Sequence, residues 1–368
     1  MLADLNSASN VLITGATGLI GGEIVRRLTS SGTGTVWTLV RPKLGEGPSE
    51  RLRQRLARSG DDRRPRRVRA IAGDVTLPGW GLSPKDARDV AERADWIIHV
   101  AADTAFGSQS DTTRTNVESV RQLIDLARRC ERAPKIAYMG TATSIGDVRN
   151  CCVAEGDGGR SQARHHNEYT QSKAIAEELL AASGLPAVTL LPTIVLSADL
   201  PDREFARQIL WFAALGVLYD ALPIEADARL DLVDVGFVAD ATLALLASGR
   251  LEHDRYHLSA GPARAIRFAD LTRLVEEAYG RDSPVRLVPP ADWGRQEQKE
   301  YVRSPVQRRM YRSLGHYLPF INMDVVYDDS RLREAVGPSP AVRPVEDYIG
   351  DLFRLIRTNE AILEAAAP

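Results

Sequence analysis

Cysteine is scarce in this sequence, and long apolar runs are missing from it. The three cysteines, Cys130, Cys151 and Cys152, are an odd number without a CxxC spacing, which argues against a disulfide framework or a zinc site. The longest apolar candidate, residues 209–219, is shorter than the roughly 18 residues that a membrane-spanning helix needs. The first residues lack the basic and apolar regions of a signal peptide. We therefore expect a cytoplasmic protein with no metal site and no membrane span.

The sequence also has no marked excess of positive or negative charge. The 47 Lys and Arg residues are balanced by 49 Asp and Glu residues, which gives a net charge of −2. Nucleic acid or an anionic membrane would favour a basic surface, so the balance speaks against both as partners. The 44% hydrophobic and 26% charged residues are typical of globular proteins and exclude a disordered chain. At roughly 150 residues per domain, 368 residues predict about two folding units.

Short apolar, β-rich runs alternate with helical patterns along the first half of the chain. Nearly continuous apolar strands between helices are typical of a parallel sheet that is covered on both faces, so we predict an α/β, doubly wound Rossmann fold. The same pattern returns with a strand end and helix at 233–248, a strand at 256–260 and a helix at 268–280. The six predicted early strands are residues 11–14, 35–40, 68–73, 96–102, 135–140 and 187–192.

This pattern divides the chain into two parts. We assign residues 1–195 to the Rossmann domain, to which residues 227–250 return. A smaller, mainly helical, substrate-binding part comprises residues 196–226 and 251–368.

A glycine-rich turn connects the first predicted strand to the first helix. In VLITGATGLIG, the glycines Gly15, Gly18 and Gly21 permit a tight turn, a close approach of main-chain amides to a pyrophosphate, and packing of the helix on the strand. The amides at a helix N-terminus favour phosphates. We therefore predict a dinucleotide site that includes Gly15, Thr17, Gly18, Leu19, Ile20 and Gly21.

The ends of the second and third strands indicate which dinucleotide binds. The second strand ends in TLVRP, where Arg41 replaces the acidic residue that binds the ribose 2′-hydroxyl in NAD-specific sites. A guanidinium suits a 2′-phosphate, so we predict NADPH; an ordinary surface arginine is the alternative. After the third strand come Asp74 and Val75, where the carboxylate would accept from the adenine amino group. The alternative for Asp74 is loop capping.

A tyrosine and a lysine four residues apart lie in a predicted helix after the fifth strand. In EYTQSKAIAEELL, Tyr169 and Lys173 share one helix face. A neighbouring ammonium stabilises a phenolate, so we expect Lys173 to lower the pKa of Tyr169. The fifth strand ends in YMGTATSIG, which places Thr141 and Ser144 at the sheet edge where such folds bind ligands. Thr141 would hydrogen-bond a substrate carbonyl, and Ser144 is a candidate substrate contact.

Together these motifs resemble the extended short-chain dehydrogenase/reductase family. HVAA at 99–102 and Asn116 in TNVESV add to the resemblance. Within that family, residues 73–106, the preceding LVRP and LPTIVLS at 190–196 resemble the fatty acyl-CoA reductase and thioester reductase branch, also called the male-sterility family. The matching motifs cover about residues 10–245.

The resemblance implies NADPH-dependent reduction of an acyl thioester, carried by coenzyme A or a carrier protein, to an aldehyde. A second hydride would give the alcohol. Such a reaction belongs to lipid or polyketide/peptide metabolism. By carry-over, Tyr169 is the proton donor, Lys173 its ribose-binding partner and Thr141 the carbonyl-orienting hydroxyl. The further cofactor residues that the resemblance implies are Ala101, Ala102, Asn116, Pro192, Thr193 and Ile194. A buried structural amide is the alternative for Asn116.

The substrate side has weaker signals. The apolar segment 205–219 would line an acyl channel or form a plain buried helix, and Phe106 and Trp211 are candidate wall residues. The Arg-rich stretch 51–70 would meet an acidic carrier protein or the phosphates of coenzyme A, or would be a solvated helix face.

Two other classes of function compete with this interpretation. The first is an NAD(P)-dependent ketone or aldehyde reductase, or a nucleotide-sugar epimerase or dehydratase, on the same scaffold. Tightly bound NAD that copurifies with the protein would favour an epimerase. The second is an NADP-binding sensor without activity, against which stands the retention of Thr141, Tyr169 and Lys173 together.

Overall fold

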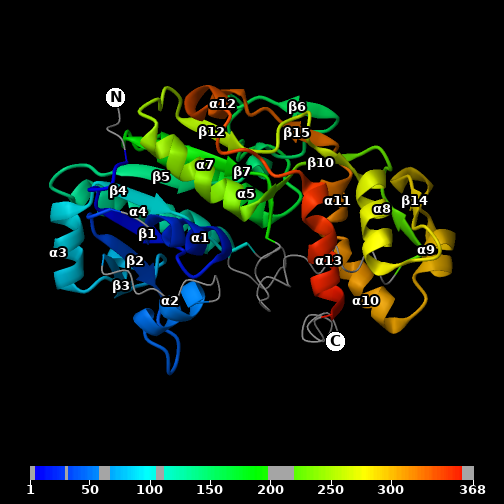
Figure 1. Cartoon of the computed structure of the whole chain (residues 1–368), viewed down its shortest axis with the longest axis horizontal. Helices are drawn as coiled ribbons and strands as arrows, with labels where there is room; N and C mark the ends of the chain where they lie inside the picture. The colour runs from blue at the N-terminus through cyan, green and yellow to red at the C-terminus, as the bar shows by residue number, and fades with distance from the viewer. Residues whose placement is uncertain (1–4, 30–31, 58–66, 105–111, 198–218, 359–368) are drawn as a thin grey trace.

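A sheet of seven parallel strands forms the centre of the fold (Figure 1). The computed structural model describes residues 5–29, 32–57, 67–104, 112–197 and 219–358. The strand order is β12-β7-β5-β4-β1-β2-β3, which confirms the predicted doubly wound α/β sheet. The strands are β1 (Val11–Thr14), β2 (Val36–Val40), β3 (Val68–Ala72), β4 (Trp96–His99), β5 (Lys135–Met139), β7 (Ala187–Pro192) and β12 (Arg255–Leu258).

The central strands form because their residues are apolar on both faces. All four residues of β1 and all five of β2 are buried. Val11 pairs with Val36 of β2 on one side and with Trp96 of β4 on the other. The chain order therefore reverses direction at β1 and β4, which is where doubly wound sheets bind ligands.

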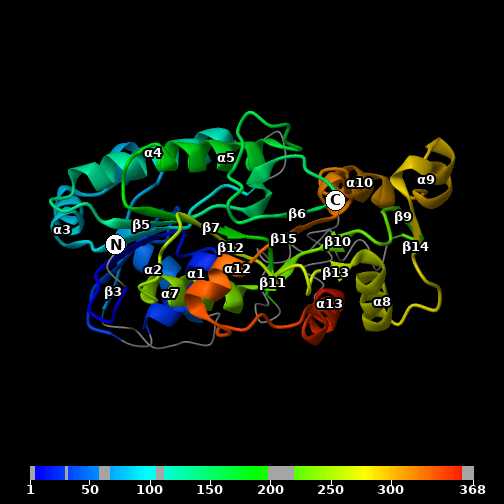
Figure 2. The ribbon, with the colours of Figure 1, turned by 90° about the horizontal axis from the view of Figure 1, so that it is seen from above.

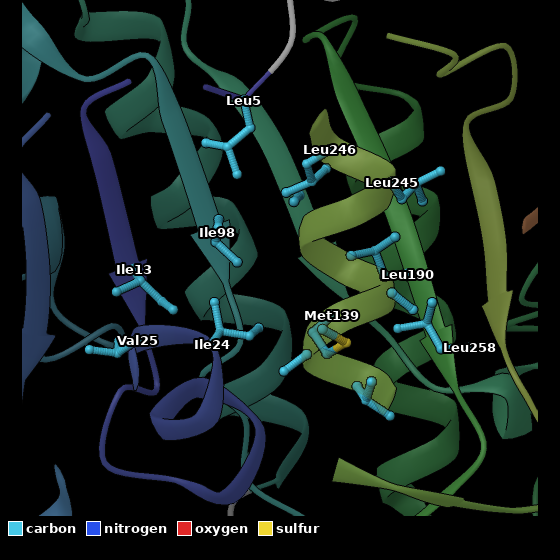
Figure 3. Packing of buried hydrophobic residues seen from close by; sticks show 14 of the residues in the cluster. Leu5, Ile13, Ile24, Val25, Ile98, Met139, Leu190, Leu245, Leu246 and Leu258 are labelled. Atoms are coloured by element: carbon cyan, nitrogen blue, oxygen red, sulfur yellow. The ribbon is translucent and has the colours of Figure 1, made fainter. Parts of the chain in front are cut away.

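Helices cover both faces of this sheet. Figure 2 shows α4 and α5 on one face and α1, α7 and α12 on the other. Side chains such as Ile13, Ile24 and Leu245 join the sheet to α1 and α7 in one apolar cluster (Figure 3). The helices are α1 (Leu19–Thr29), α2 (Pro48–Ala57), α3 (Pro84–Arg93), α4 (Thr112–Arg129), α5 (Glu168–Ala181), α7 (Val235–Ala247) and α12 (Ser330–Val336), with the 3₁₀ turns η1 (Pro78–Gly81) and η2 (Ala142–Ile145).

A second lobe packs around its own apolar cluster, which includes Phe268, Leu271 and Phe353. Its predicted helix at 268–280 is confirmed as α8, which ends at Gly280 in the left-handed region with φ 63°. The lobe's helical elements are α8 (Phe268–Tyr279), η3 (Pro290–Asp292), α9 (Arg295–Tyr301), α10 (Pro305–Leu314), α11 (Leu318–Ile321), η4 (Val345–Asp347) and α13 (Ile349–Thr358).

Four two-stranded pairs accompany the large sheet. They are β8 (Ile194–Leu196) with β11 (Leu232–Asp234), β9 (Ala221–Pro223) with β14 (Arg286–Val288), β10 (Arg229–Leu230) with β13 (Ile266–Arg267), and β6 (Cys151–Val153) with β15 (Val325–Tyr327). β6 and β15 are far apart in sequence, so their pairing links the segment after β5 to the late part of the chain.

The large sheet extends beyond residue 250. β12, which our division assigned to the substrate-binding part, pairs in parallel with β7, and Leu332 of α12 packs in the cluster on the sheet. Among the residues that the structure describes, no helix is both long and apolar enough to cross a bilayer.

Candidate active site

A cleft of about 800 Å³ lies where the carboxyl ends of the sheet strands face the second lobe. Residues that follow β1, β2, β3, β4, β5 and β7 all line it, because parallel strands end at the same edge of a sheet. From our predicted site, the cleft is lined by Gly15, Thr17, Gly18, Leu19, Ile20, Gly21, Arg41, Asp74, Val75, Ala101, Ala102, Thr141, Tyr169, Lys173, Pro192, Thr193 and Ile194.

The glycine-rich turn brings main chain close to main chain. Gly15 has a φ of 72°, and a Cβ there would lie 2.8 Å from the amide nitrogen of Ala101. A Cβ at Gly21 would lie 2.3 Å from the carbonyl oxygen of Gly15. The buried Arg55 of α2 donates to the carbonyls of Gly18 and Leu19, at 3.2 and 3.3 Å. This tight turn at the start of α1 fits a dinucleotide pyrophosphate, which needs exposed main-chain amides.

The end of β4 is held beside this turn by side-chain hydrogen bonds. The Thr14 hydroxyl accepts from the amides of Val100 and Ala101, each at 3.1 Å. Asn116 is buried rather than part of the cleft lining: its Oδ1 accepts from Asp103 N at 2.8 Å, and its Nδ2 donates to Ser172 Oγ at 3.0 Å. Asn116 thus connects the segment after β4 to α5, as expected for the structural alternative.

Basic and acidic side chains meet at the end of the cleft formed by β2 and β3. The Arg41 side chain is 69% exposed, and its Nη1 lies 3.7 Å from Asp74 Oδ2. Asp74 Oδ1 accepts from the amide and hydroxyl of Thr76, at 2.9 and 2.8 Å, which is the loop-capping arrangement. Arg51 of α2 also lines the cleft and donates to the carbonyl of Arg41. The exposed guanidinium of Arg41 fits a phosphate group.

The opposite end of the cleft holds the predicted reactive residues. Tyr169, at the start of α5, shares a side-chain hydrogen bond with Thr141, the residue that caps η2. The Lys173 ammonium donates to the carbonyl of Met139 at 2.8 Å and lies 4.9 Å from the centre of the Tyr138 ring. Three elements, β5, η2 and α5, therefore bring these groups together.

Burial determines the protonation of this pair. It raises the pKa of Tyr169 to about 12, against the lowering effect of the hydrogen bond with Thr141. It also lowers the pKa of Lys173 to about 8, which the Glu177 charge opposes. Our expectation that the pKa of Tyr169 is lowered is thus wrong in this structure, because desolvation outweighs the stabilisation of the phenolate.

The other predicted contacts have different positions. Ser144 does not line the cleft; it is buried beside Glu177. Thr193 does line it, and its hydroxyl donates to Asp231 Oδ1 at 2.8 Å. Phe106, Trp211, most of the segment 205–219 and the middle of the Arg-rich stretch 51–70 lie outside the described residues.

Sequence reasoning missed one wall of the cleft. The second lobe contributes a largely apolar group that comes from α11, β15 and their neighbours, and β10 and β11 contribute the charged Arg229 and the buried Asp231. No spacing motif marks these positions, although the pattern RLDLVD places three charged residues among apolar ones. The apolar group is Tyr317, Phe320, Ile321, Met323, Val325 and Tyr327.

Comparison with known families and relatives agrees with this geometry. The family described as male sterility protein, an NAD-binding family, matches residues 13–242, more than half of the chain. A Drosophila melanogaster protein named as a fatty acyl-CoA reductase is 25% identical over 325 residues, which cover 76% of this chain and 60% of that protein. Fatty acyl-CoA reductase 1 of Homo sapiens is 33% identical over 144 residues, or 36% of this chain and 28% of that enzyme. The matches thus span less than two thirds of either relative.

Solved structures share the fold. The terminal R domain of the myxalamid PKS-NRPS pathway superposes with a TM-score of 0.78 at 23% identity, covering 96% of this chain and 92% of that domain. The dTDP-glucose 4,6-dehydratase of Bacillus anthracis, in complex with NAD, superposes with a TM-score of 0.67 at 15% identity, covering 98% and 100%. A nicotinamide dinucleotide is therefore the cofactor class that the family and fold support.

Proposed function

Because the chain belongs to the male sterility protein family, we propose that it is an NADPH-dependent oxidoreductase that reduces an acyl thioester to an aldehyde. The family match and the relatives named as fatty acyl-CoA reductases support the thioester as substrate. The observation that carries the proposal is the hydrogen-bonded pair of Thr141 and Tyr169, which lies in the same cleft as the glycine-rich turn.

The proposed chemistry divides between the cofactor and the chain. When bound, reduced nicotinamide supplies a hydride for the thioester carbonyl carbon. The hydroxyls of Thr141 and Tyr169 hydrogen-bond the carbonyl oxygen, which becomes negatively charged as the hydride arrives. Tyr169 then donates its proton to that oxygen. Tyr169 is neutral at pH 7 and so carries the proton that it donates, although burial, which raises its pKa to about 12, makes it a weaker acid than a free tyrosine.

The products follow from the balance of atoms. The resulting hemithioacetal loses its thiol, as the C–S bond breaks and the carbon–oxygen double bond re-forms. One thioester, one NADPH and one proton thus give one aldehyde, one thiol and NADP⁺. A second NADPH and proton would reduce the aldehyde to the alcohol.

The proposed preference for NADPH over NADH rests on the positive charge at one end of the cleft. Arg41 follows β2, where it would meet the ribose, and its exposed guanidinium would donate hydrogen bonds to a 2′-phosphate. Lys173, whose side chain reaches the end of β5, would bind the hydroxyls of the nicotinamide ribose. The segment Pro192, Thr193 and Ile194 would flank the nicotinamide through its main chain.

The test is to incubate the protein with NADPH and a panel of acyl-CoA and acyl-carrier-protein thioesters. Absorbance of reduced nicotinamide and free thiol are followed in the same sample. Oxidation of NADPH with matching release of thiol, lost in Tyr169→Phe, is expected. Consumption of ketones, aldehydes or nucleotide sugars without any consumption of thioester would overturn the proposal in favour of the other enzymes on this scaffold.

A further inference from the structure

A buried carboxylate lies one helical turn beyond Lys173. Glu177 of α5 is 1% exposed and is not among the predicted site residues. Its Oε2 lies 3.4 Å from Nη2 of Arg255, which comes from the edge strand β12. The Ser144 side chain and the main chain of Gly159 lie beside the carboxylate and lower its pKa, while Oε1 has no hydrogen-bond partner among the described residues. Burying a charge in this way is costly, so these partners are needed to keep it there.

The surroundings of this carboxylate leave it little room to move. A Cβ at Gly140 would lie 3.0 Å from Glu177 Oε1, and a Cβ at Gly159 would lie 2.9 Å from Oε2. Gly140 directly precedes Thr141, and Ser144 belongs to the same turn, η2. Glu177 therefore connects α5 to the main chain that carries Thr141.

Glu177 is also the counter-charge of the lysine. The Lys173 ammonium has a neutral hydrogen-bond acceptor, the carbonyl of Met139. The charge on Glu177 raises the pKa of Lys173 and so opposes the effect of burial. Burial raises the pKa of Glu177 to about 7, and the Ser144 side chain, Arg255 and Lys173 oppose this effect by favouring the ionised carboxylate. Burial raises the pKa of Tyr138 and Tyr169, and the Glu177 charge raises both further. On the other side, burial and then the charge on Lys173 lower the pKa of His99 of β4 to about 3.

We infer that Glu177 is a positioning residue, which keeps Lys173 protonated and holds the Thr141 turn against α5. The inference rests on the proposed function, because Lys173 must be a cation to bind ribose hydroxyls and assist Tyr169. As the pH rises through the pKa of Lys173, the cation is lost. Removal of the Glu177 charge moves that loss to lower pH.

The small number of lysines makes a direct measurement possible. The chain has five, Lys43, Lys85, Lys135, Lys173 and Lys299, so ¹³Cε-lysine NMR gives five signals. The signal that disappears in Lys173→Arg is assigned to Lys173. Its pH titration, without substrate or cofactor, then reports the pKa of the ammonium.

The decisive comparison is between two neighbouring glutamates. In Glu177→Gln, we expect the pKa of Lys173 to fall by about one unit. Glu178→Gln is the matched control, because Glu178 is exposed and binds Ser161 of the loop instead. It should leave the Lys173 titration unchanged. A Lys173 pKa that is the same in Glu177→Gln as in the wild type, or that shifts equally in both variants, overturns the inference.

A second variant and a second measurement complete the test. Glu177→Asp keeps the negative charge but moves it farther from Lys173, so the pKa of Lys173 should fall less than in Glu177→Gln. This variant replaces Glu177→Gln if the Gln variant does not fold. NADPH affinity, measured against pH, should decline at high pH as Lys173 loses its proton, and this decline should move to lower pH in Glu177→Gln. If the titration shifts but no thioester is reduced by the wild type, the proposed function fails and the charge pair stands. If the wild type reduces a thioester but the pKa of Lys173 does not shift in Glu177→Gln, the proposed function stands and the role of Glu177 fails.

Discussion

Thr141 and Tyr169 share a side-chain hydrogen bond, although one ends a strand and the other begins a helix. Thr141 follows β5 at the carboxyl edge of the sheet and caps η2, which packs against α5. Both hydroxyls line the same cleft. Both hydroxyls can therefore donate hydrogen bonds to one carbonyl oxygen.

Replacement of Tyr169 by phenylalanine removes the proton donor and retains the ring. We expect kcat to fall by about 10²- to 10⁴-fold, the range for loss of a general acid. NADPH affinity, measured by fluorescence titration, should change by less than about threefold, because a ring of nearly the same size remains. A variant with near wild-type kcat would show that another group supplies the proton.

Arg41→Ala tests the basis of the cofactor preference. Loss of a charged hydrogen-bond partner should weaken NADPH binding by about 10- to 100-fold and leave NADH binding nearly unchanged. Arg53→Ala is the control, because Arg53 lies on the same side of the fold but pairs with Glu50 and does not line the cleft. Equal weakening of NADPH and NADH by Arg41→Ala would contradict a 2′-phosphate contact.

Gly21→Ala tests the packing of α1 on the glycine-rich turn. A methyl group would meet the Gly15 carbonyl at 2.3 Å, so α1 must shift. We expect the free energy of unfolding, measured in urea, to fall by about 1–3 kcal/mol, with weaker NADPH binding. Gly47→Ala is the control, since a Cβ there meets nothing within 4 Å. An unchanged unfolding midpoint in Gly21→Ala would show that the turn adapts freely.

The buried carboxyl of Glu155 should make the free energy of unfolding depend on pH. It is 1% exposed and accepts from the amide of His257 at 2.8 Å, and burial raises its pKa to about 7 from 4.5. A carboxyl whose pKa is higher in the folded than in the unfolded state stabilises the fold below the unfolded pKa, and this contribution disappears as the pH rises through 7.

The measurement compares the wild type with Glu155→Gln in urea across this range. As the pH falls from about 7.5 to 4.5, the wild type should gain about 3 kcal/mol in unfolding free energy relative to the variant. A difference between the two proteins that does not depend on pH would place the pKa of Glu155 near its ordinary value.

Much of the fold could be predicted, because most strands of the sheet are nearly continuously apolar and helices such as α8 end at clear signals, here Gly280. The members of the cleft could also be predicted in part, since parallel strands bring their carboxyl ends to one edge. Gly15, Arg41, Asp74 and Thr141 each follow such a strand.

The rest depends on tertiary contacts that no local pattern reports. Asp231 lies between β10 and β11, and the apolar wall around Phe320 comes from the second lobe; neither segment has a characteristic spacing. The pKa of Tyr169 depends on how completely its surroundings exclude water, and the sequence does not show this. The pairing of Glu177 with Arg255 needs α5 and β12 to meet in space.

The most direct test of the account follows the hydride itself. The protein is given an acyl thioester and NADPH deuterated at C4, with each label stereoisomer in turn, and the products are analysed by mass spectrometry alongside free thiol. The account predicts that one stereoisomer delivers one deuterium to the former carbonyl carbon of the aldehyde, with one thiol released per aldehyde formed. Oxidised NADPH without deuterium at that carbon, or without thiol, would contradict it.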